Sequence, residues 1–265
     1  MKQVLSVQDL SCLGKCSLSV AMPVLSVMGY ACTPLPTAIL STHTGFPTPH
    51  VRSLTEDIAQ TCDHWQKIGA RFDGISVGYL SDPTQAAAVE QVLEAFPAPV
   101  VLDPVMGDHG KCYTGIGADH VAAVKQLCTK ATVLLPNITE ACLLTGIPYR
   151  QTTDAGWYAA LLAATAALGV EKVILTGVSL SEGKTGFVGT EGISYQTDTL
   201  PGSFHGTGDL FAAVFTGSFV LGRDLAASAA LAAGFVERVI RATGEPSPFG
   251  VNFESQLPWL WQQLL

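Results

Sequence analysis

Long apolar runs, basic residues and charge in general are scarce in this sequence. No uninterrupted apolar stretch reaches the roughly 20 residues that a membrane-spanning helix requires. Charged residues make up only 14% of the chain against 48% hydrophobic residues, and 14 Lys and Arg face 22 Asp and Glu, for a net charge of −8. Negative charge disfavours broad contact with nucleic acid phosphates and with anionic membranes. We therefore expect small-molecule partners, with no nucleic acid and no membrane.

The cysteines lack the spacing of a metal site or of a disulfide framework. There are seven, an odd number, and none belongs to a C-x-x-C pair. A secretion signal is missing as well, because the first two residues lead into a strand-length run over 3–8 and not into a longer apolar segment with a cleavage site. These absences favour reduced thiols and a cytoplasmic location.

A Walker A phosphate-binding loop is also absent, although the Gly-Lys pairs at 14–15 and 183–184 suggest one at first sight. For the first pair, the motif needs glycine where the chain has Asp9 and Ser or Thr where it has Cys16. The second pair fails similarly, because Val178 stands at the glycine position. That pair is more typical of a hairpin turn.

The chain does carry a repeated alternation of short apolar strands and helices, which is typical of an α/β protein with a parallel sheet. With 265 residues and no internal repeat or linker, it is expected to form a single domain over residues 1–265. The expected strands are 4–7, 33–40, 74–80, 100–102, 132–135, 172–177 and a hairpin within 186–197. The expected helices are 16–28, 51–68, one starting at Asp82-Pro83, 154–168, one from the stretch 205–213 to about residue 221, 225–241 and a short one containing Trp259 and Trp261.

Two carboxylates follow the apolar strand 100–102. Asp103 ends it directly, and Asp108 comes five residues later. Ligands of open α/β sheets bind just outside the carboxyl ends of the strands, and Mg²⁺ prefers one or two carboxylates together with phosphate oxygens of a substrate. The pair therefore suits a magnesium site. The alternative is that both acids only cap turns.

Polar residues follow two further strands. After strand 132–135, Asn137 and Glu140 suit either a ligand site at the sheet edge or an ordinary helix start. Strand 33–40 contains two prolines, which place it near a sheet edge. The polar stretch 41–46 comes after it and suits the wall of a substrate site or, alternatively, a plain Ser/Thr turn.

The stretch 205–213 places two glycines and a carboxylate where a turn gives way to a long apolar helix. Gly206 and Gly208 can adopt backbone angles that direct successive N–H groups into one concavity, and helix N-termini favour anions. Asp209 would lie beside any phosphate bound there. The alternative is structural, with Thr207 or Asp209 serving as the N-cap of the helix.

Together these stretches resemble the ribokinase-like superfamily, in the branch of the pyridoxal kinases and hydroxymethylpyrimidine kinases. The resemblance spans essentially the whole chain. Its carriers are Gly206-Thr207-Gly208-Asp209-Leu210-Phe211-Ala212-Ala213, Asp103-Pro104-Val105-Met106-Gly107-Asp108, Pro136-Asn137-Ile138-Thr139-Glu140-Ala141 and Ser41-Thr42-His43-Thr44-Gly45-Phe46, the last favouring the pyridoxal kinase side. The resemblance implies a doubly wound, mostly parallel sheet flanked by helices, with ATP at its carboxyl edge. It also implies phosphoryl transfer to a hydroxymethyl group, which for a pyridoxal kinase is the 5′-hydroxymethyl group of pyridoxal, pyridoxine or pyridoxamine in vitamin B6 salvage.

The resemblance also implies roles for single residues. Asp209 would accept the proton of the attacking hydroxyl group. The N–H groups of Gly206, Thr207 and Gly208 would neutralise charge on the transferred phosphoryl group. The implied magnesium ligands, direct or through water, are Asp103, Asp108, Asn137 and Glu140.

The remaining implied contacts concern ATP, the substrate and a second subunit. ATP would contact Asp108, Asn137, Thr176, Thr207 and Gly208, with a monovalent cation such as K⁺ near Thr176. The substrate ring would contact Asp9, Thr44, Tyr79 and Asp209. Many members of the superfamily are homodimers, and the edge strand 33–40 is the candidate interface.

One departure from the family concerns the choice of substrate. Pyridoxal kinases often carry Gln-Ser after the first strand, whereas this chain has Gln8-Asp9, followed by Gly-Lys-Cys-Ser at 14–17. An acid at position 9 would suit the positively charged aminomethyl group of pyridoxamine better than an aldehyde. The alternative functions are phosphorylation of hydroxymethylpyrimidine in thiamine synthesis and non-catalytic binding of a vitamer or nucleotide on the same fold.

Overall fold

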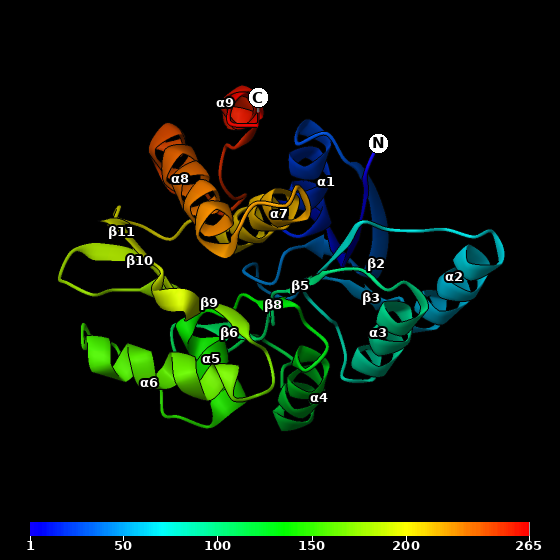
Figure 1. The fold of residues 1–265 in the computed structure, drawn as a ribbon, viewed down its shortest axis with the longest axis horizontal. Coiled ribbons are helices and arrows are strands. Elements are labelled where there is room, and N and C mark those ends of the chain that lie inside the picture. The colour runs from blue at the N-terminus through cyan, green and yellow to red at the C-terminus, as the bar shows by residue number, and fades with distance from the viewer. Residues whose placement is uncertain (265) are drawn as a thin grey trace.

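A nine-stranded sheet forms the centre of the structure, a computed structural model that describes residues 1–264 (Figure 1). Its strands are β1 (Gln3–Leu13), β2 (Ala31–Thr42), β3 (Val51–Ser53), β4 (Gly74–Val77), β5 (Val100–Leu102), β8 (Val133–Leu134), β9 (Lys172–Val178), β10 (Lys184–Gly189) and β11 (Ser194–Asp198). They lie in the order β11-β10-β9-β8-β5-β4-β1-β2-β3, parallel from β9 to β2 and antiparallel at both edges. A separate hairpin is formed by β6 (Gly107–Asp108) and β7 (Lys111–Cys112).

Helices cover both faces of this sheet. One face carries α1 (Leu18–Val27), α7 (Thr207–Val220), α8 (Leu225–Thr243) and α9 (Leu257–Gln262). The other carries α2 (Thr55–Lys67), α3 (Thr84–Ala95), α4 (Ala118–Cys128), α5 (Ile138–Thr145) and α6 (Ala155–Ala166). Figure 1 shows the first group along the top and the second below and to the right. These layers confirm the doubly wound, mostly parallel α/β fold that the resemblance implied.

Alternate residues of the central strands face the two helix layers. Val4 of β1 belongs to the core against α1 and α7, whereas Leu5 and Val7 belong to the core against α2, α3 and α4. Val133 and Leu134 of β8 divide in the same way. Because these strands are buried on both faces, consecutive residues of each strand are buried, and β5 and β8 are entirely apolar.

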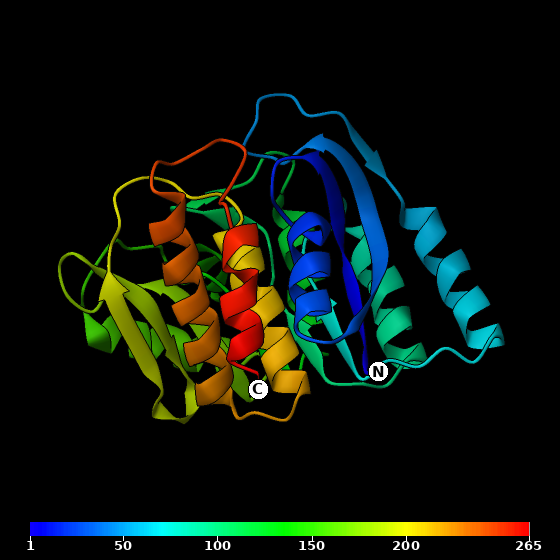
Figure 2. The ribbon, with the colours of Figure 1, turned by 90° about the horizontal axis from the view of Figure 1, so that it is seen from above.

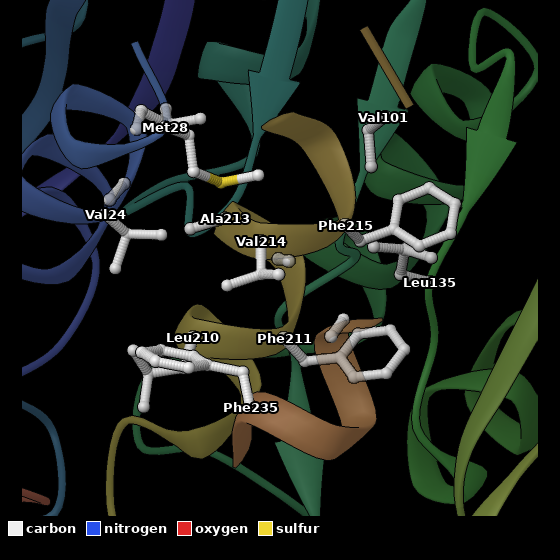
Figure 3. Close-up of a cluster of buried hydrophobic side chains, with 14 of the residues drawn as sticks. Val24, Met28, Val101, Leu135, Leu210, Phe211, Ala213, Val214, Phe215 and Phe235 are labelled. Atoms are coloured by element: carbon white, nitrogen blue, oxygen red, sulfur yellow. The ribbon is translucent and has the colours of Figure 1, made fainter. Parts of the chain in front are cut away.

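Helix α7 is apolar on nearly all sides because it packs against α1, α8 and the sheet. Figure 3 shows Phe211 and Phe215 of α7 on the side that faces Leu135, which directly follows β8. The two phenyl rings are stacked, with centroids 6.2 Å apart and planes inclined by 15°. Burying a side chain of this size contributes about 1.5–3 kcal/mol to folding. The packed body of α7 thereby holds its first turn in place at the edge of the sheet.

The direction in which the chain crosses the sheet reverses between β1 and β4. From β1 the chain moves outward to β2, and it then returns to β4 and continues the other way through β5, β8 and β9. Open α/β sheets bind ligands at such a switch point, outside the carboxyl ends of the strands. Three predicted site residues lie at this switch point: Asp9 of β1, Tyr79 after β4 and Asp103 after β5.

The second predicted helix was placed wrongly at its start. It was expected over 51–68, but 51–53 pairs with β2 as strand β3, and the helix begins at Thr55. Ser53 and Thr55 both donate hydrogen bonds to Asp82 Oδ2, at 2.8 and 2.7 Å, which holds the end of β3 and the start of α2 against the start of α3. Elements β6, β7 and α4 were not predicted.

None of the helices within residues 1–264 is long and apolar enough to cross a membrane. All seven cysteines are free thiols in this part of the chain. Cys62, Cys128 and Cys142 are buried, where they pack as small apolar side chains.

His120 of α4 is buried without a hydrogen-bond partner. It is 2% exposed, and neither ring nitrogen makes a hydrogen bond to the rest of the described chain. Burial lowers the pKa of His120 below its ordinary value, so the folded state favours a neutral ring. As the pH falls through about 6.5, the unfolded chain gains a proton that the folded chain does not bind, and stability is lost.

We expect His120→Leu to raise the free energy of unfolding by about 1–2 kcal/mol at neutral pH, because two unpaired buried nitrogens are removed. The gain should be larger at acidic pH, because the proton-linked loss of stability disappears. Urea unfolding at several pH values measures both effects. The control is His64→Leu on the exposed side of α2, which should leave the pH dependence as it is. A wild-type pH dependence in His120→Leu would contradict this account.

Candidate active site at the switch point

Asp209 stands in the first turn of α7, at a helix N-terminus that no side chain caps. Gly206 is the N-cap residue and makes no side-chain capping bond. The first helical hydrogen bond runs from Leu210 N to Gly206 O, at 3.0 Å. The amide nitrogens of Thr207 and Gly208 donate no hydrogen bond within the described chain, so both can bind an anion. The alternative in which Thr207 or Asp209 is the N-cap is therefore wrong.

Gly206 is required by its backbone angle and by its neighbours. Its φ of 85° lies in the left-handed region that residues with a side chain rarely adopt. A Cβ at this position would overlap the carbonyl oxygen of Lys15. The loop between β1 and α1 thus packs directly against the start of α7, and this approach brings the end of β1 close to Asp209.

Asp9 lies on β1 at an irregularity of the sheet. The pairing of β1 with β2 shifts register here, so that residues 37 and 38 of β2 both stand opposite Asp9. Bulges of this kind re-aim a side chain near an active site. Asp9 is 3% exposed, and its Oδ2 accepts a hydrogen bond from Ser11 Oγ at 2.9 Å.

Ser17 joins Asp9 to Asp209, a role that was not predicted from the sequence. It is buried, has a φ of 52°, and lies close enough to both carboxylates to lower their pKa values. A serine held at such a φ is strained, and strain of this kind is common at functional sites. The only signal in the sequence is its place directly after the glycine-containing stretch 14–16, where the loop turns into α1.

The carboxyl group of Asp209 has an altered acidity. Burial raises its pKa to about 7, the negative charge of Asp9 adds to this effect, and hydrogen bonds from Ser17 oppose it. Burial also raises the pKa of Asp9. Within residues 1–264, no Lys or Arg nitrogen lies within 4.0 Å of either carboxylate. Asp209 can therefore exchange a proton near neutral pH.

A second acidic pair lies after β5 and at the start of α5. Burial, together with the charge of Asp209, raises the pKa of Asp103 to about 8. Glu140 is 2% exposed, and burial and Asp103 raise its pKa well above the ordinary value. Asp103 therefore interacts with both Asp209 and Glu140. The predicted catalytic residue and the predicted magnesium ligands share one site.

Asn137 and Glu140 also build the N-terminus of α5. Asn137 is the N-cap, and its Oδ1 accepts a hydrogen bond from Glu140 N at 2.9 Å. In return, Glu140 Oε2 accepts from Asn137 N at 2.8 Å, and Oε1 accepts from Met106 N at 3.1 Å. The helix start that the sequence left as an alternative is confirmed. Each carboxylate oxygen keeps a second lone pair, so Glu140 can still accept from a water molecule.

Asp108 stands on the short hairpin of β6 and β7, above the buried acids. It is exposed, and its Oδ1 accepts a hydrogen bond from His109 N at 2.7 Å. Asn137 Nδ2 donates to Gly107 O at 2.8 Å, which ties the hairpin to α5. Asp108 is close enough to Glu140 to raise the pKa of that carboxyl group as well.

Tyr113 follows β7 and was not predicted as a site residue. Burial and the charges of four acids raise the pKa of its hydroxyl group; the acids are Glu140, Asp108, Asp103 and Asp209. Its amide nitrogen donates to Met106 O at 2.9 Å, which turns the chain back toward the site. The strand-end acids were identified because they follow predicted strands. No strand was predicted directly before Tyr113, so no such signal marked this residue.

The acids at this edge have the composition of a magnesium site that a substrate completes. Among residues 1–264, no three His, Cys, Asp or Glu side chains converge closely enough to hold an ion on their own. Mg²⁺ is usually bound by one or two carboxylates, several waters and phosphate oxygens, and Asp103 and Asp108 offer two carboxylates. The donor set therefore fits Mg²⁺ that binds together with a nucleotide.

Thr176 of β9 lies on the same side as α5. It forms an isolated parallel bridge with Asn137, and its amide nitrogen donates to Pro136 O at 2.9 Å. This position is next to the predicted ATP and magnesium residues and is not part of the group around Asp9. It fits a contact to nucleotide or to a monovalent cation.

Aromatic side chains from three loops form a cluster next to the start of α7, where His205 directly precedes Gly206. His43 is 5% exposed, and its ring centroid lies 4.8 Å from that of Phe46 and 4.8 Å from that of His205. Phe46 lies 5.6 Å from Phe249 between ring centroids. Figure 2 shows the loop between β2 and β3 meeting the segment that follows α8. These rings form a wall that suits an aromatic substrate.

Thr44 and Tyr79 border this wall. Thr44 is half-buried and directly follows His43 in the loop after β2. Tyr79, at the end of β4, is 9% exposed, and burial and the charge of Asp9 raise the pKa of its hydroxyl group. Both positions fit the substrate contacts that the resemblance implied.

Known proteins resemble this chain along most of its length. The family described as phosphomethylpyrimidine kinase matches residues 25–251. The pyridoxine/pyridoxal/pyridoxamine kinase of Bordetella pertussis is 30% identical over 265 residues, which cover 91% of this chain and 89% of that protein. A Bacteroides thetaiotaomicron protein crystallised in a form with pyridoxal has a TM-score of 0.92 and 34% identity, over 98% of this chain and 95% of that one.

The pyridoxal kinase of Lactobacillus plantarum has a TM-score of 0.91 and 34% identity, over 99% of this chain and 98% of that one. These similarities cover the strand-end acids, the hairpin and the start of α7 alike. They confirm the family and the fold that the sequence motifs predicted. The chain therefore belongs to the phosphomethylpyrimidine kinase family, and its relatives in that family include ribokinase-like pyridoxal kinases.

Proposed function

We propose that this protein is an ATP-dependent pyridoxal kinase, a single kinase domain over residues 1–265, that phosphorylates the 5′-hydroxymethyl group of a B6 vitamer in vitamin B6 salvage. The observation that carries the proposal is the position of Asp209. Its carboxyl group lies in the first turn of an uncapped helix, close enough to Asp9 and to Asp103 for the charges to interact. The named pyridoxal kinases among the relatives support the same class of substrate.

Each group of the site would perform one part of the transfer. The carboxylate of Asp209 accepts the proton of the substrate hydroxyl group while that oxygen forms a bond to the γ-phosphorus of ATP. The bond from this phosphorus to the bridging oxygen breaks, and its electron pair stays on ADP. The N–H groups of Thr207 and Gly208 bind the oxygens of the transferred phosphoryl group. A loose transition state depends on positioning more than on a strong base, so a carboxylate suffices.

The nucleotide side of the site would need cations because it is acidic. Asp103 and Asp108 would hold Mg²⁺, with Asn137 and Glu140 acting through water, and the bound ion would neutralise charge on the ATP phosphates. Thr176 is the candidate neighbour of a monovalent cation such as K⁺. Assays with and without each salt test these assignments. Full activity in the presence of a strong chelator would overturn the magnesium assignment.

The direct test is a phosphorylation assay with ATP and, in turn, pyridoxal, pyridoxine, pyridoxamine and hydroxymethylpyrimidine. Hydroxymethylpyrimidine is the second candidate because the matching family is described by a phosphomethylpyrimidine substrate. We expect a B6 vitamer to have the highest kcat/KM. A higher value for hydroxymethylpyrimidine would replace the proposal, and tight vitamer binding without turnover would favour a non-catalytic role.

We expect kcat to fall as the pH drops below about 7, because burial and the charge of Asp9 raise the pKa of Asp209 to about 7. Only the ionised carboxylate can accept the proton, so activity is lost on the acidic side, by about tenfold per pH unit. Steady-state rates at saturating substrates, measured over about pH 5.5 to 9, give the profile. A rate that stays constant down to the acidic end would show that Asp209 does not titrate in this range.

We further propose that the protein is a cytoplasmic homodimer. Strand β2 is the second strand from the edge of the sheet. The edge strand β3 covers only a short part of it, by pairing with Ala38, Ile39 and Leu40. Ile39 and Val51 expose 39% and 42% of their surface there, and exposed apolar side chains at a sheet edge suit a contact surface. Sedimentation velocity and cell fractionation test the two parts. A monomer at micromolar concentration would overturn the first.

A further inference from the structure

Asp9 is an acid of the site that the transfer reaction does not use. It is 3% exposed, and the side chain that donates a hydrogen bond to it is the neutral hydroxyl group of Ser11. Removing a carboxylate from water without a positive partner is destabilising. A cation bound beside Asp9 would compensate for this cost.

His43 lies near Asp9, but both of its ring nitrogens are hydrogen-bonded to the backbone and neither bonds to Asp9. Gly45 N donates to His43 Nδ1 at 3.1 Å, so this nitrogen carries no proton. The other ring nitrogen, Nε2, lies 2.7 Å from Pro248 O and therefore donates its proton to that carbonyl group. His43 therefore makes no hydrogen bond to Asp9.

Lys15, the lysine nearest to Asp9 in the sequence, is engaged elsewhere. Its Nζ lies 2.8 Å from Glu254 Oε2 and 3.0 Å from Asn252 Oδ1. No other Lys or Arg nitrogen of the described chain lies within 4.0 Å of Asp9. Asp209, on the other side of Ser17, adds a second acid. The described chain thus provides negative charge and no Lys or Arg partner at the place where the substrate ring is proposed to bind.

We propose that Asp9 makes this kinase selective for pyridoxamine by pairing with its positively charged 4′-aminomethyl group. The inference rests on the proposed function. The three vitamers share the ring and the hydroxymethyl group that receives the phosphate, and they differ only in the aldehyde, alcohol or amine at the 4′ position. Of these, the amine is the cation near neutral pH, with three hydrogen-bond donors. A charge-assisted hydrogen bond in a buried site discriminates by about 10- to 100-fold.

The test compares kcat/KM for pyridoxamine and pyridoxine at saturating MgATP in the wild type, Asp9→Asn and Asp9→Glu. We expect the wild type to prefer pyridoxamine. Asp9→Asn keeps the size of the side chain but removes its charge, and it should lower the ratio of kcat/KM for pyridoxamine to kcat/KM for pyridoxine by about 10- to 100-fold. Effects of the lost charge on Asp209 act on both substrates and cancel in this ratio. Asp9→Glu should restore part of the preference. Asp63→Asn on the exposed side of α2 is the control and should leave the ratio unchanged.

The outcomes separate this inference from the proposed function. If the wild type neither binds nor phosphorylates a B6 vitamer, the proposed function fails. If it phosphorylates both and Asp9→Asn leaves their ratio unchanged, the role of Asp9 is refuted and the kinase assignment stands. If Asp9→Asn does not fold, the wild type is assayed with 4-deoxypyridoxine, which carries a methyl group in place of the aminomethyl group of pyridoxamine. We expect kcat/KM for 4-deoxypyridoxine to be about tenfold or more below kcat/KM for pyridoxamine. Equal values for the two compounds would overturn the inference.

Discussion

Asp209→Asn is expected to lower kcat by about 10²- to 10⁴-fold, the usual contribution of a positioned proton acceptor. The amide keeps the size of the side chain and can still accept hydrogen bonds, but it cannot take the proton of the attacking hydroxyl group. The N–H groups of Thr207 and Gly208 stay in place, so the affinity for ATP should change little. Steady-state kinetics and equilibrium binding of a non-hydrolysable ATP analogue measure the two quantities separately.

A change in folding would not explain this loss. The substitution removes a buried charge that repels Asp9 and Asp103, so the melting temperature of Asp209→Asn should equal or exceed that of the wild type. Asp63→Asn carries the same chemical change on the exposed side of α2 and should keep full activity. Near-normal turnover in Asp209→Asn would remove Asp209 from the role of proton acceptor.

Gly206→Ala is expected to destabilise the fold by about 2–4 kcal/mol and to lower kcat by about 100-fold or more. The alanine would have to keep a φ of 85°, and its Cβ would overlap the carbonyl oxygen of Lys15. The start of α7 or the loop after β1 must then move. Either shift displaces the free N–H groups from the phosphoryl group and Asp209 from the hydroxyl group, and displacements of about 1 Å are costly in catalysis.

Gly29→Ala is the matched control for this substitution. Gly29 has a similar φ of 88°, but a Cβ there would meet nothing within 4 Å. This variant measures the cost of the backbone angle alone, about 1 kcal/mol. It should remain fully active because Gly29 follows the C-terminus of α1, whereas the site lies at the N-terminus of that helix. If Gly206→Ala were no less stable and no less active than Gly29→Ala, the contact with Lys15 would not matter for the site.

The parts of the fold that could be predicted are those whose signals are local. The apolar run 100–102 and the acid that follows it, Asp103, can be recognised as a strand and its polar end from neighbouring residues alone. Parallel packing of the strands then places this acid at the edge where α/β sheets bind ligands. Strand β3 could not be found in this way, because three exposed residues form a strand only through pairing with β2. The prediction of a helix from residue 51 failed for this reason.

The sequence by itself determined which chemical groups are available: Asp209 after two glycines, acids at the ends of two strands, and a loop that suits an aromatic wall. Only the tertiary structure decided how they act together. Asp9 and Asp209 lie 200 positions apart and meet because Gly206 allows two loops to touch. His43 and Pro248, which are hydrogen-bonded, likewise lie 205 positions apart. The capping box of Asn137 and Glu140, in contrast, spans three positions and is local. The physical reason is that acidity and charge compensation depend on burial and on neighbours that are distant in the chain, and no local pattern of residues contains this information.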